Sequence, residues 1–556
     1  MAHIYKKIKK GREYYYIRET QRVENRPATI NQVYLGSLDK LEAIWAGEDP
    51  KAREGYSPKE FGSLFVINEL DRAINLAELV DEVLPAKRRS KGPTLGGLLF
   101  YAVLNRAIAP TSKRQLAGWY ETTDIQRIRP LRLTSLNSQN FWNYWHRLGE
   151  TSLEIITGRF FQRVQAVLPA SDDYLLRWNP SYHSLPSFPE MTQSQGSALI
   201  IQRNTGVPVY HHQGPPDLTP AAFLDRHLKG LLDKVQAMEA KVRSLTWIFP
   251  PGLASEKVIQ RIDAQEGLHF VAPFPSHLAP ELAGINLESL QLMPEDGRWR
   301  PIRGGTAEEP RRFYEIKLPV WGRTRKVLLI FDPGAYRQKF QELKELGKKL
   351  KWKLRRYPSG QSQKDEPGAL EGRYQELCRE LNLDPELFRL EIRREKGVAV
   401  PSLEVDEPKI AAQAQESAKT LLITDQEDWL PEELLQAYQG GPILAPEGTA
   451  APSLGLPALM PQYHWTPSKV RINTFVSLVA LTYLALLGLR LKSGGLKISP
   501  QEAIQEMRGL KSAIFWLPQE EKFKRLLKAP TPGQQAIMQA LGFTVREGAV
   551  IPRVAA

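Results

Sequence analysis

The chain has 556 residues, of which 42% are hydrophobic, so it is long enough for several domains and can bury a sizeable core. Lys and Arg number 75 against 62 Asp and Glu, and the resulting net charge of +13 makes nucleic acid the first partner to consider. The single cysteine, Cys378, excludes an internal disulfide framework and a cysteine-based zinc cluster.

Residues 1–50 are predicted to form a small, basic, β-rich segment that binds DNA. Two extended runs, 14–18 and 29–35, are separated by a turn-like stretch at 25–27. Tyrosines and cations are interleaved in the first run, a pattern that favours contact with phosphates. A solvated hairpin without a ligand is the alternative. The candidate DNA contacts in this segment are Lys6, Lys7, Lys9, Lys10 and Arg12.

Residues 51–170 are predicted to be a helical domain. The run 95–109 is apolar at helical spacing, and a basic cluster precedes it. Helices with basic loops beside them can contact a duplex groove, although a helical packing domain without a ligand is an equally good interpretation. The candidate DNA contacts here are Lys87, Arg88, Arg89 and Lys91.

Residues 171–272 carry an ordered series of strand and helix signals. Strands are predicted at 174–176, 197–202, 207–211, 245–249 and 268–271, with helices at 223–238 and 255–265. Three strands, helix, strand, helix, strand is the element order of the RNase H-like α/β fold. We therefore expect residues 171–272 to be the first part of an RNase H-like core.

Residues 273–415 are predicted to be an insertion into this core. Strands are expected at 311–318 and 326–331, followed by a helical hairpin whose first helix spans 336–354. The outer face of that helix is rich in cations, which suggests a phosphate-binding arm. The candidate DNA contacts of the arm are Lys348, Lys349, Lys351 and Lys353.

Residues 416–515 are predicted to be the second part of the core, with a strand at 418–424, a helix at 431–438 and a Pro- and Gly-rich loop at 440–461. The apolar run 475–489 is shorter than the ~20 residues of a membrane span, so we expect a buried helix and no membrane association. Residues 516–556 are expected to be a C-terminal tail within a helix-prone region at 500–546.

Five stretches are similar, in order, to stretches of one family: 34–38 (YLGSL), 268–271 (LHFV), 421–425 (LLITD), 463–466 (YHWT) and 469–475 (KVRINTF). With them the chain resembles the DDE transposases of bacterial insertion sequences, in the group that carries a Y-R-E-K signature. The resemblance covers most of the chain, up to about residue 514. It implies an RNase H-like core, double-stranded DNA as partner, and three carboxylates that hold two Mg²⁺ ions.

The carboxylate positions of the family carry other residues in this chain. The first aspartate, which follows an apolar pair, corresponds to Trp178. The second corresponds to Pro250, and the glutamate, seven residues after the signature tyrosine Tyr438, corresponds to Ala445. None of these three side chains can bind a metal ion, so the resemblance implies a protein that has lost its Mg²⁺ and its catalysis.

The leading hypothesis is a catalytically inactive, DDE-transposase-like DNA-binding protein, repurposed for regulation or as part of a nucleic-acid machine. One alternative is an interaction scaffold for another transposase or for a nucleic-acid-guided effector. A decayed insertion-sequence gene without a function is the alternative to all of these hypotheses. A homodimer and a protein partner both stay open, and we expect a cytoplasmic, nucleoid-associated location, since the first residues contain no apolar signal core. The last alternative is an active transposase with displaced metal ligands, drawn from Asp172, Asp173, Asp217, Asp425 and Glu447.

Overall fold

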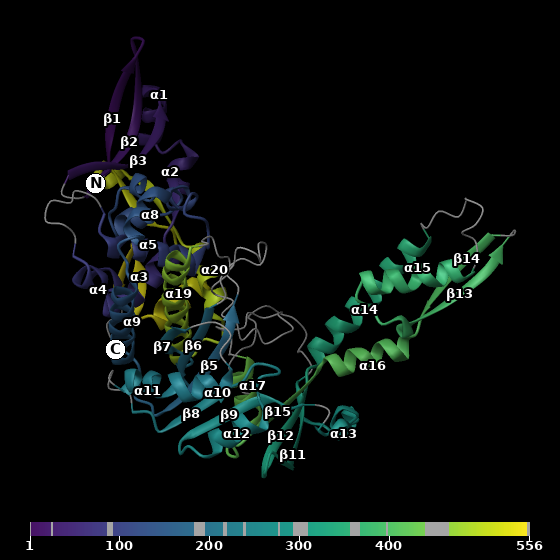
Figure 1. Cartoon of the computed structure of the whole chain (residues 1–556). Helices are drawn as coiled ribbons and strands as arrows, with labels where there is room; N and C mark the ends of the chain where they lie inside the picture. Colours follow the sequence, from purple (N-terminus) through teal and green to yellow (C-terminus); the bar gives the residue numbers. More distant parts are fainter. Residues whose placement is uncertain are drawn as a thin grey trace.

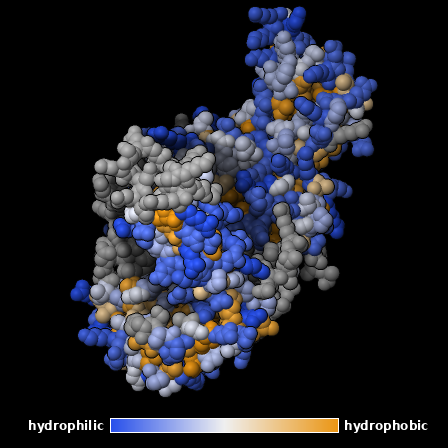
Figure 2. Space-filling view, turned by 90° about the vertical axis from the view of Figure 1, so that its right-hand side faces the viewer, coloured by the Kyte–Doolittle hydropathy of each residue, from blue (hydrophilic) through white to orange (hydrophobic). Residues whose placement is uncertain are grey.

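The computed structural model is a mixed α/β structure built on one large sheet, with a small sheet at one end of the body and an arm that extends from it (Figure 1). Figure 2, turned so that the arm points toward the viewer, shows a mostly hydrophilic surface with hydrophobic side chains gathered toward the lower end of the body. The structure describes residues 2–23, 26–85, 93–182, 195–214, 219–236, 241–275, 278–292, 310–355, 367–395, 398–439 and 466–552.

The large sheet has nine strands in the order β10-β11-β12-β15-β9-β8-β5-β6-β7. Strands β5, β8 and β9 are parallel to one another, and the remaining pairs are antiparallel. The element order predicted for residues 171–272 is confirmed. The elements are β5 (Asp173–Tyr182), β6 (Gln195–Gln202), β7 (Pro208–Gly214), α10 (Pro220–Phe223), η3 (Leu224–Leu228), α11 (Lys229–Gln236), β8 (Ser244–Ile248), α12 (Glu256–Asp263) and β9 (Leu268–Pro273).

The strands predicted for the insertion, β11 (Arg312–Val320) and β12 (Arg323–Phe331), lie in the large sheet instead of apart from it. Strand β12 joins the sheet through β15 (Lys419–Thr424), which pairs with β9. The cause is the sequence of β12, whose last five residues, Val327 to Phe331, are all apolar and buried, because a strand that is apolar on both faces must be covered on both sides. Two short elements, α13 (Pro280–Ala283) and β10 (Gln291–Leu292), precede them.

The arm begins after β12 and ends before β15. The predicted helical hairpin is confirmed in α14 (Pro333–Arg355) and α15 (Pro367–Glu380), but the arm also contains a β-hairpin and a third helix that the sequence did not reveal. It has an apolar cluster of its own, to which Leu350, Leu377 and Leu403 belong. The additional elements are β13 (Phe388–Glu395), β14 (Val398–Val405) and α16 (Glu407–Ser417).

Helix α19 (Pro467–Ser493) runs through the helical part of the body and packs against α5. The prediction that the apolar helix is too short to span a membrane is wrong, because the helix has 27 residues and begins in the polar stretch before the apolar run. It is the one described helix with the length and composition of a membrane span, yet 89% of its apolar window is buried, which confirms a core helix. It also contacts α3 (Gly62–Ile74) and α9 (Glu150–Ala166). The other helices of this region are α4 (Leu76–Val83), α5 (Leu95–Ile108), α6 (Leu116–Glu121), α7 (Ile125–Ile128) and α8 (Ser138–Trp145).

The C-terminal region, predicted to be helix-prone, also contains strands. Strands β16 (Lys511–Leu517) and β17 (Lys522–Leu527) form a three-stranded sheet with β4 (Tyr56–Glu60). Because β4 follows the N-terminal segment directly, this sheet brings the N-terminal and C-terminal parts of the chain together. The other elements of the region are α17 (Pro431–Gln439), α20 (Pro500–Arg508), α21 (Pro532–Ala540), β18 (Phe543–Arg546) and β19 (Ala549–Pro552).

Candidate nucleic-acid interface

The N-terminal segment is an antiparallel sheet of three strands, β1 (Ala2–Lys9), β2 (Arg12–Val23) and β3 (Arg26–Gly36). A two-residue turn joins β1 to β2, and both of its residues, Lys10 and Gly11, have positive φ values of 49° and 76°. Such turns match the twist of the strands they join and favour glycine. The hairpin therefore ends in a tight, cationic tip.

Because side chains alternate along each strand, the sheet has two distinct faces. The inner face carries Ile17 and Leu35, both buried, and it packs against α1 (Leu38–Trp45) and against Ile514 and Phe523 of the C-terminal strands. A short helix, α2 (Pro50–Glu54), completes the segment. The register places a second set of side chains on the outer face, which we call the tyrosine face. The tyrosine face consists of Tyr5, Lys7, Lys9, Arg12, Tyr14, Tyr16, Arg18, Gln32 and Tyr34.

Four tyrosines from all three strands contact one another across this face. The ring centroids of Tyr5 and Tyr16 are 6.5 Å apart, those of Tyr16 and Tyr34 are 5.2 Å apart, and those of Tyr14 and Tyr34 are 6.2 Å apart. Tyr34 is 56% exposed in spite of these contacts. Rings that hold one another in place lose little freedom on binding and offer both a flat apolar surface and hydroxyl groups to a ligand.

The charged side chains of the tyrosine face are all cationic. Among the described residues of the sheet, the carboxylates Glu13 and Glu19 lie on the inner face, and the outer face has none. Of the five predicted DNA contacts, Lys7, Lys9 and Arg12 lie on the tyrosine face and Lys10 lies in the turn. Lys6 does not, because it points to the inner side and forms a 2.7 Å ion pair with Glu13.

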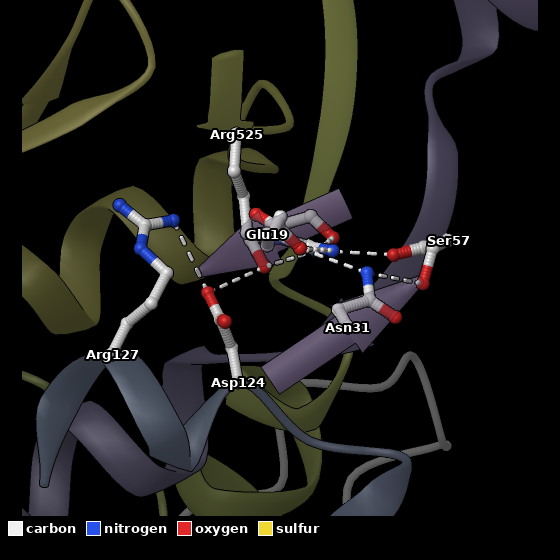
Figure 3. Close-up of polar contacts among 7 residues, drawn as sticks. Glu19, Asn31, Ser57, Asp124, Arg127 and Arg525 are labelled. Carbon is white, nitrogen blue, oxygen red and sulfur yellow. Dashed lines mark hydrogen bonds and ion pairs between the residues drawn. The ribbon is translucent and has the colours of Figure 1, made fainter. Parts of the chain in front are cut away.

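A buried ion pair fixes the sheet to the body (Figure 3). The guanidinium of Arg525, on β17, donates to the carboxylate of Glu19, on β2, at 2.8 Å, and their side chains are only 3% and 8% exposed. Arg525 also donates to the carbonyl oxygen of Ser57 at 3.0 Å. Asn31 of β3 donates to Glu19 at 2.8 Å. The sheet is therefore oriented by residues far apart in the sequence.

The same network extends into the helical domain. Ser512 donates to Asp124 at 2.7 Å and accepts from Arg525, while Arg127 pairs with Asp124 at 3.2 Å (Figure 3). Burial favours the neutral form of Glu19, but the hydrogen bonds and charge of Arg525 outweigh it and hold the pKa of Glu19 below its usual value. For Asp124 burial prevails, and its pKa is raised.

The positions that correspond to the family's two aspartates come together in the large sheet. The parallel register pairs Arg177 of β5 with Ile248 of β8, so Trp178 and Pro250 lie at the same, carboxyl-terminal edge. Trp178 is 2% exposed, and its ring centroid lies 5.0 Å from that of Phe223. Neither side chain offers an oxygen ligand to a metal ion. Ala445 lies outside the described residues.

Arg177 is a residue at this edge that the sequence analysis missed. It is buried, and its guanidinium donates to the carbonyl oxygens of Ala437 and Tyr438, at the C-terminal end of α17, the second at 3.0 Å. Burial lowers the pKa of Arg177 to about 10, so the group stays cationic at neutral pH. Because successive side chains of a strand alternate, Arg177 points to the face of the sheet opposite Trp178, toward α17. Trp178 and Pro250 offer no oxygen ligand, so these two positions do not fit the metal pair that the family resemblance implies. The sequence signal that could have identified Arg177 is a single charged residue within an apolar run of β5.

The carboxylates considered as displaced ligands do not converge. Asp172 pairs with Arg243 at 2.9 Å and Asp173 with Arg203 at 2.9 Å, both at the start of β5 and away from Trp178. Asp425 bonds the Nδ1 atom of His269 at 2.9 Å, and this hydrogen bond raises the pKa of His269. Within the described ranges no three His, Cys, Asp or Glu side chains group as metal ligands. Asp217 and Glu447 lie outside those ranges.

The predicted contacts of the arm are less favourably placed than those of the tyrosine face. In the arm, Lys348 pairs with Glu345 at 2.7 Å and Lys353 pairs with Glu380, so half of the four lysines are compensated internally. Lys349 and Lys351 lie on the same helix. The cluster of Lys87, Arg88, Arg89 and Lys91 lies outside the described residues.

Replacing Trp178 with alanine is expected to destabilise the protein by about 3 to 5 kcal/mol, because it empties a large volume between β5 and α10. The measurement is denaturant-induced unfolding followed by circular dichroism. Trp352→Ala is the control, since Trp352 is 54% exposed, and it should change stability little. Equal losses in the two variants would show that Trp178 is not a core residue.

No protein-family model matches the sequence, and neither does any curated protein. Among solved structures, the chain is similar to a piggyBac transposase in a synaptic complex with hairpin DNA, determined by cryo-electron microscopy. The TM-score is 0.32 and the sequence identity 10%, with 80% of this chain and 79% of that chain covered. A TM-score of this size does not establish a common fold, so a function has to be sought in the residues themselves.

Proposed function

We propose that this protein binds double-stranded DNA through its tyrosine face and does not cut it. The tyrosine face is the observation that carries the proposal. It combines three predicted cations, four exposed or half-exposed tyrosines and Arg18, with no carboxylate among its described residues. Phosphate contacts from Lys, Arg and Tyr side chains are the usual source of affinity for duplex DNA.

We further infer that the large sheet is an RNase H-like core whose catalytic edge has been filled. The order of strands and helices from β5 to β9 supports this assignment. Trp178 and Pro250 stand at two of the three positions where the resemblance to DDE transposases calls for carboxylates, and Trp178 is buried. The protein is then an inactive relative of DDE transposases that has kept the means of holding DNA.

The test incubates the purified protein with supercoiled plasmid and labelled linear duplex, in the presence of Mg²⁺ or Mn²⁺. We expect a stable complex with the duplex at low salt and neither nicked nor joined products. Metal-dependent cleavage that disappears in Asp173→Ala or Glu447→Ala would contradict the proposal and favour a displaced active site. A failure to bind any duplex at low salt would instead leave the interaction scaffold as the better hypothesis.

A further inference from the structure

Arg18 differs from the other cations of the tyrosine face because its position is fixed by two neighbours. Its guanidinium carbon lies 3.5 Å from the ring centroid of Tyr5, so the planar group stacks on the ring. Its Nε and Nη2 atoms donate to the side-chain oxygen of Gln32 at 3.3 and 3.1 Å. These contacts orient the guanidinium before any ligand arrives.

The N–H groups of Arg18 that do not bond to Gln32 are suited to a pair of acceptors. An arginine has five N–H groups, and two of those of Arg18 are engaged by Gln32. Within the part of the chain that the structure describes, no carboxylate neutralises this guanidinium. The stacked, oriented fork therefore presents free N–H groups at the face, with its charge uncompensated.

Arg18 also occupies the position from which base edges are reached. It lies on β2, the central strand, opposite His3 on β1 and Gln32 on β3. The cations that suit phosphates, Lys7, Lys9 and Arg12, lie farther along, toward the hairpin tip. The major groove of B-DNA admits a two-stranded β-ribbon, and β2 forms such a ribbon with either of its neighbours.

We infer that Arg18 recognises a guanine in the major groove, so that the tyrosine face binds duplex DNA with sequence preference; this inference rests on the proposed function. Guanine offers two acceptors, O6 and N7, and their spacing matches two N–H groups of a guanidinium. Adenine recognition by Gln32 is disfavoured, because the amide oxygen that would accept from the adenine amino group is already bonded to Arg18. Gln32 is thus a positioning residue, and its side chain offers only N–H donors to the DNA.

The test selects binding sites for the full-length protein from a library of random duplexes and then measures affinities on the selected site. We expect one guanine that does not tolerate exchange, with a loss of about 5- to 150-fold when its pair becomes A·T. Placing 7-deazaguanine at that position should weaken the wild type by a similar factor, because the N7 acceptor is gone.

Arg18→Ala should bind guanine, 7-deazaguanine and A·T duplexes equally, with little change in the salt dependence of binding. The control is Lys7→Gln, which should weaken binding to all three duplexes alike and retain the guanine preference. Thermal unfolding of each variant checks that the sheet is intact. A selected site without a fixed guanine, or an Arg18→Ala variant that keeps the preference, would overturn the inference while leaving DNA binding itself in place. Absence of binding to every duplex would overturn the proposed function as well.

Discussion

Binding to duplex DNA is expected to fall roughly a hundredfold between about 50 and about 200 mM salt, as for a protein that neutralises about four phosphates. Each phosphate contact releases a condensed counterion, so the logarithm of the affinity falls linearly with the logarithm of the salt concentration. The side chains placed to make such contacts are Lys7, Lys9 and Arg12 on the tyrosine face, with Lys10 at the hairpin tip.

The variant Lys7→Gln/Lys9→Gln/Arg12→Gln should lower that slope by about 2 to 3, because three charge contacts are removed. It should weaken binding to all sequences alike. From the sequence alone, Lys348→Gln/Lys349→Gln/Lys351→Gln/Lys353→Gln would also be expected to flatten the slope by several units. We now expect a smaller change for this arm variant, because Lys348 and Lys353 already have carboxylate partners.

The measurement is a salt titration of duplex binding by fluorescence anisotropy for the wild type and both variants. Lys6→Gln is a matched control, since its ammonium pairs with Glu13 on the inner face of the sheet. A steep loss in the arm variant together with an unchanged slope in the N-terminal variant would move the interface to the arm. Equal effects of Lys6→Gln and Lys7→Gln would show that the two faces of the sheet are not distinguished.

How far the sequence predicts this interface depends on the range of the interactions involved. The cations and tyrosines between Lys6 and Arg18 are visible as a pattern, and so are the strands that carry them. Which of them share a face follows from strand alternation. Which face is free does not, because the inner face is covered by Ile514 and Phe523, about 500 residues away.

The same limit explains why the sequence did not show that β11 and β12 join the large sheet. The apolar run of β12 shows that it is buried, but not that its partner is β15, which follows only after the whole arm. Trp178 lies within β5 and Pro250 follows β8, and both strands belong to the parallel set, so the order of the strand signals already indicates that the two positions lie near the same edge. Arg177 was overlooked because its partners, the last carbonyl groups of α17, cannot be located without the fold.

Removal of Arg525 is expected to lower the stability of the protein strongly. Arg525→Met should destabilise the protein by about 3 to 5 kcal/mol, because it leaves the carboxylate of Glu19 buried without its counter-charge. The double variant Glu19→Leu/Arg525→Met should recover most of that loss, since two apolar side chains replace the pair without a buried charge. Lys6→Met, which breaks the exposed pair with Glu13, should change stability little.

Stability should also depend on pH through Glu19. Its folded-state pKa lies below the ordinary value of 4.5, so the stabilisation is present above pH 4.5 and is lost as the pH falls through the folded-state pKa. The raised pKa of Asp124 acts in the opposite direction, so the difference between wild type and Glu19→Gln isolates the contribution of Glu19. Denaturant unfolding of each variant at pH 7 and at pH 3 measures it.

In the Arg525 series, a loss in Arg525→Met that the double variant does not recover would mean that Arg525 acts through its bonds to Ser57 and Ser512.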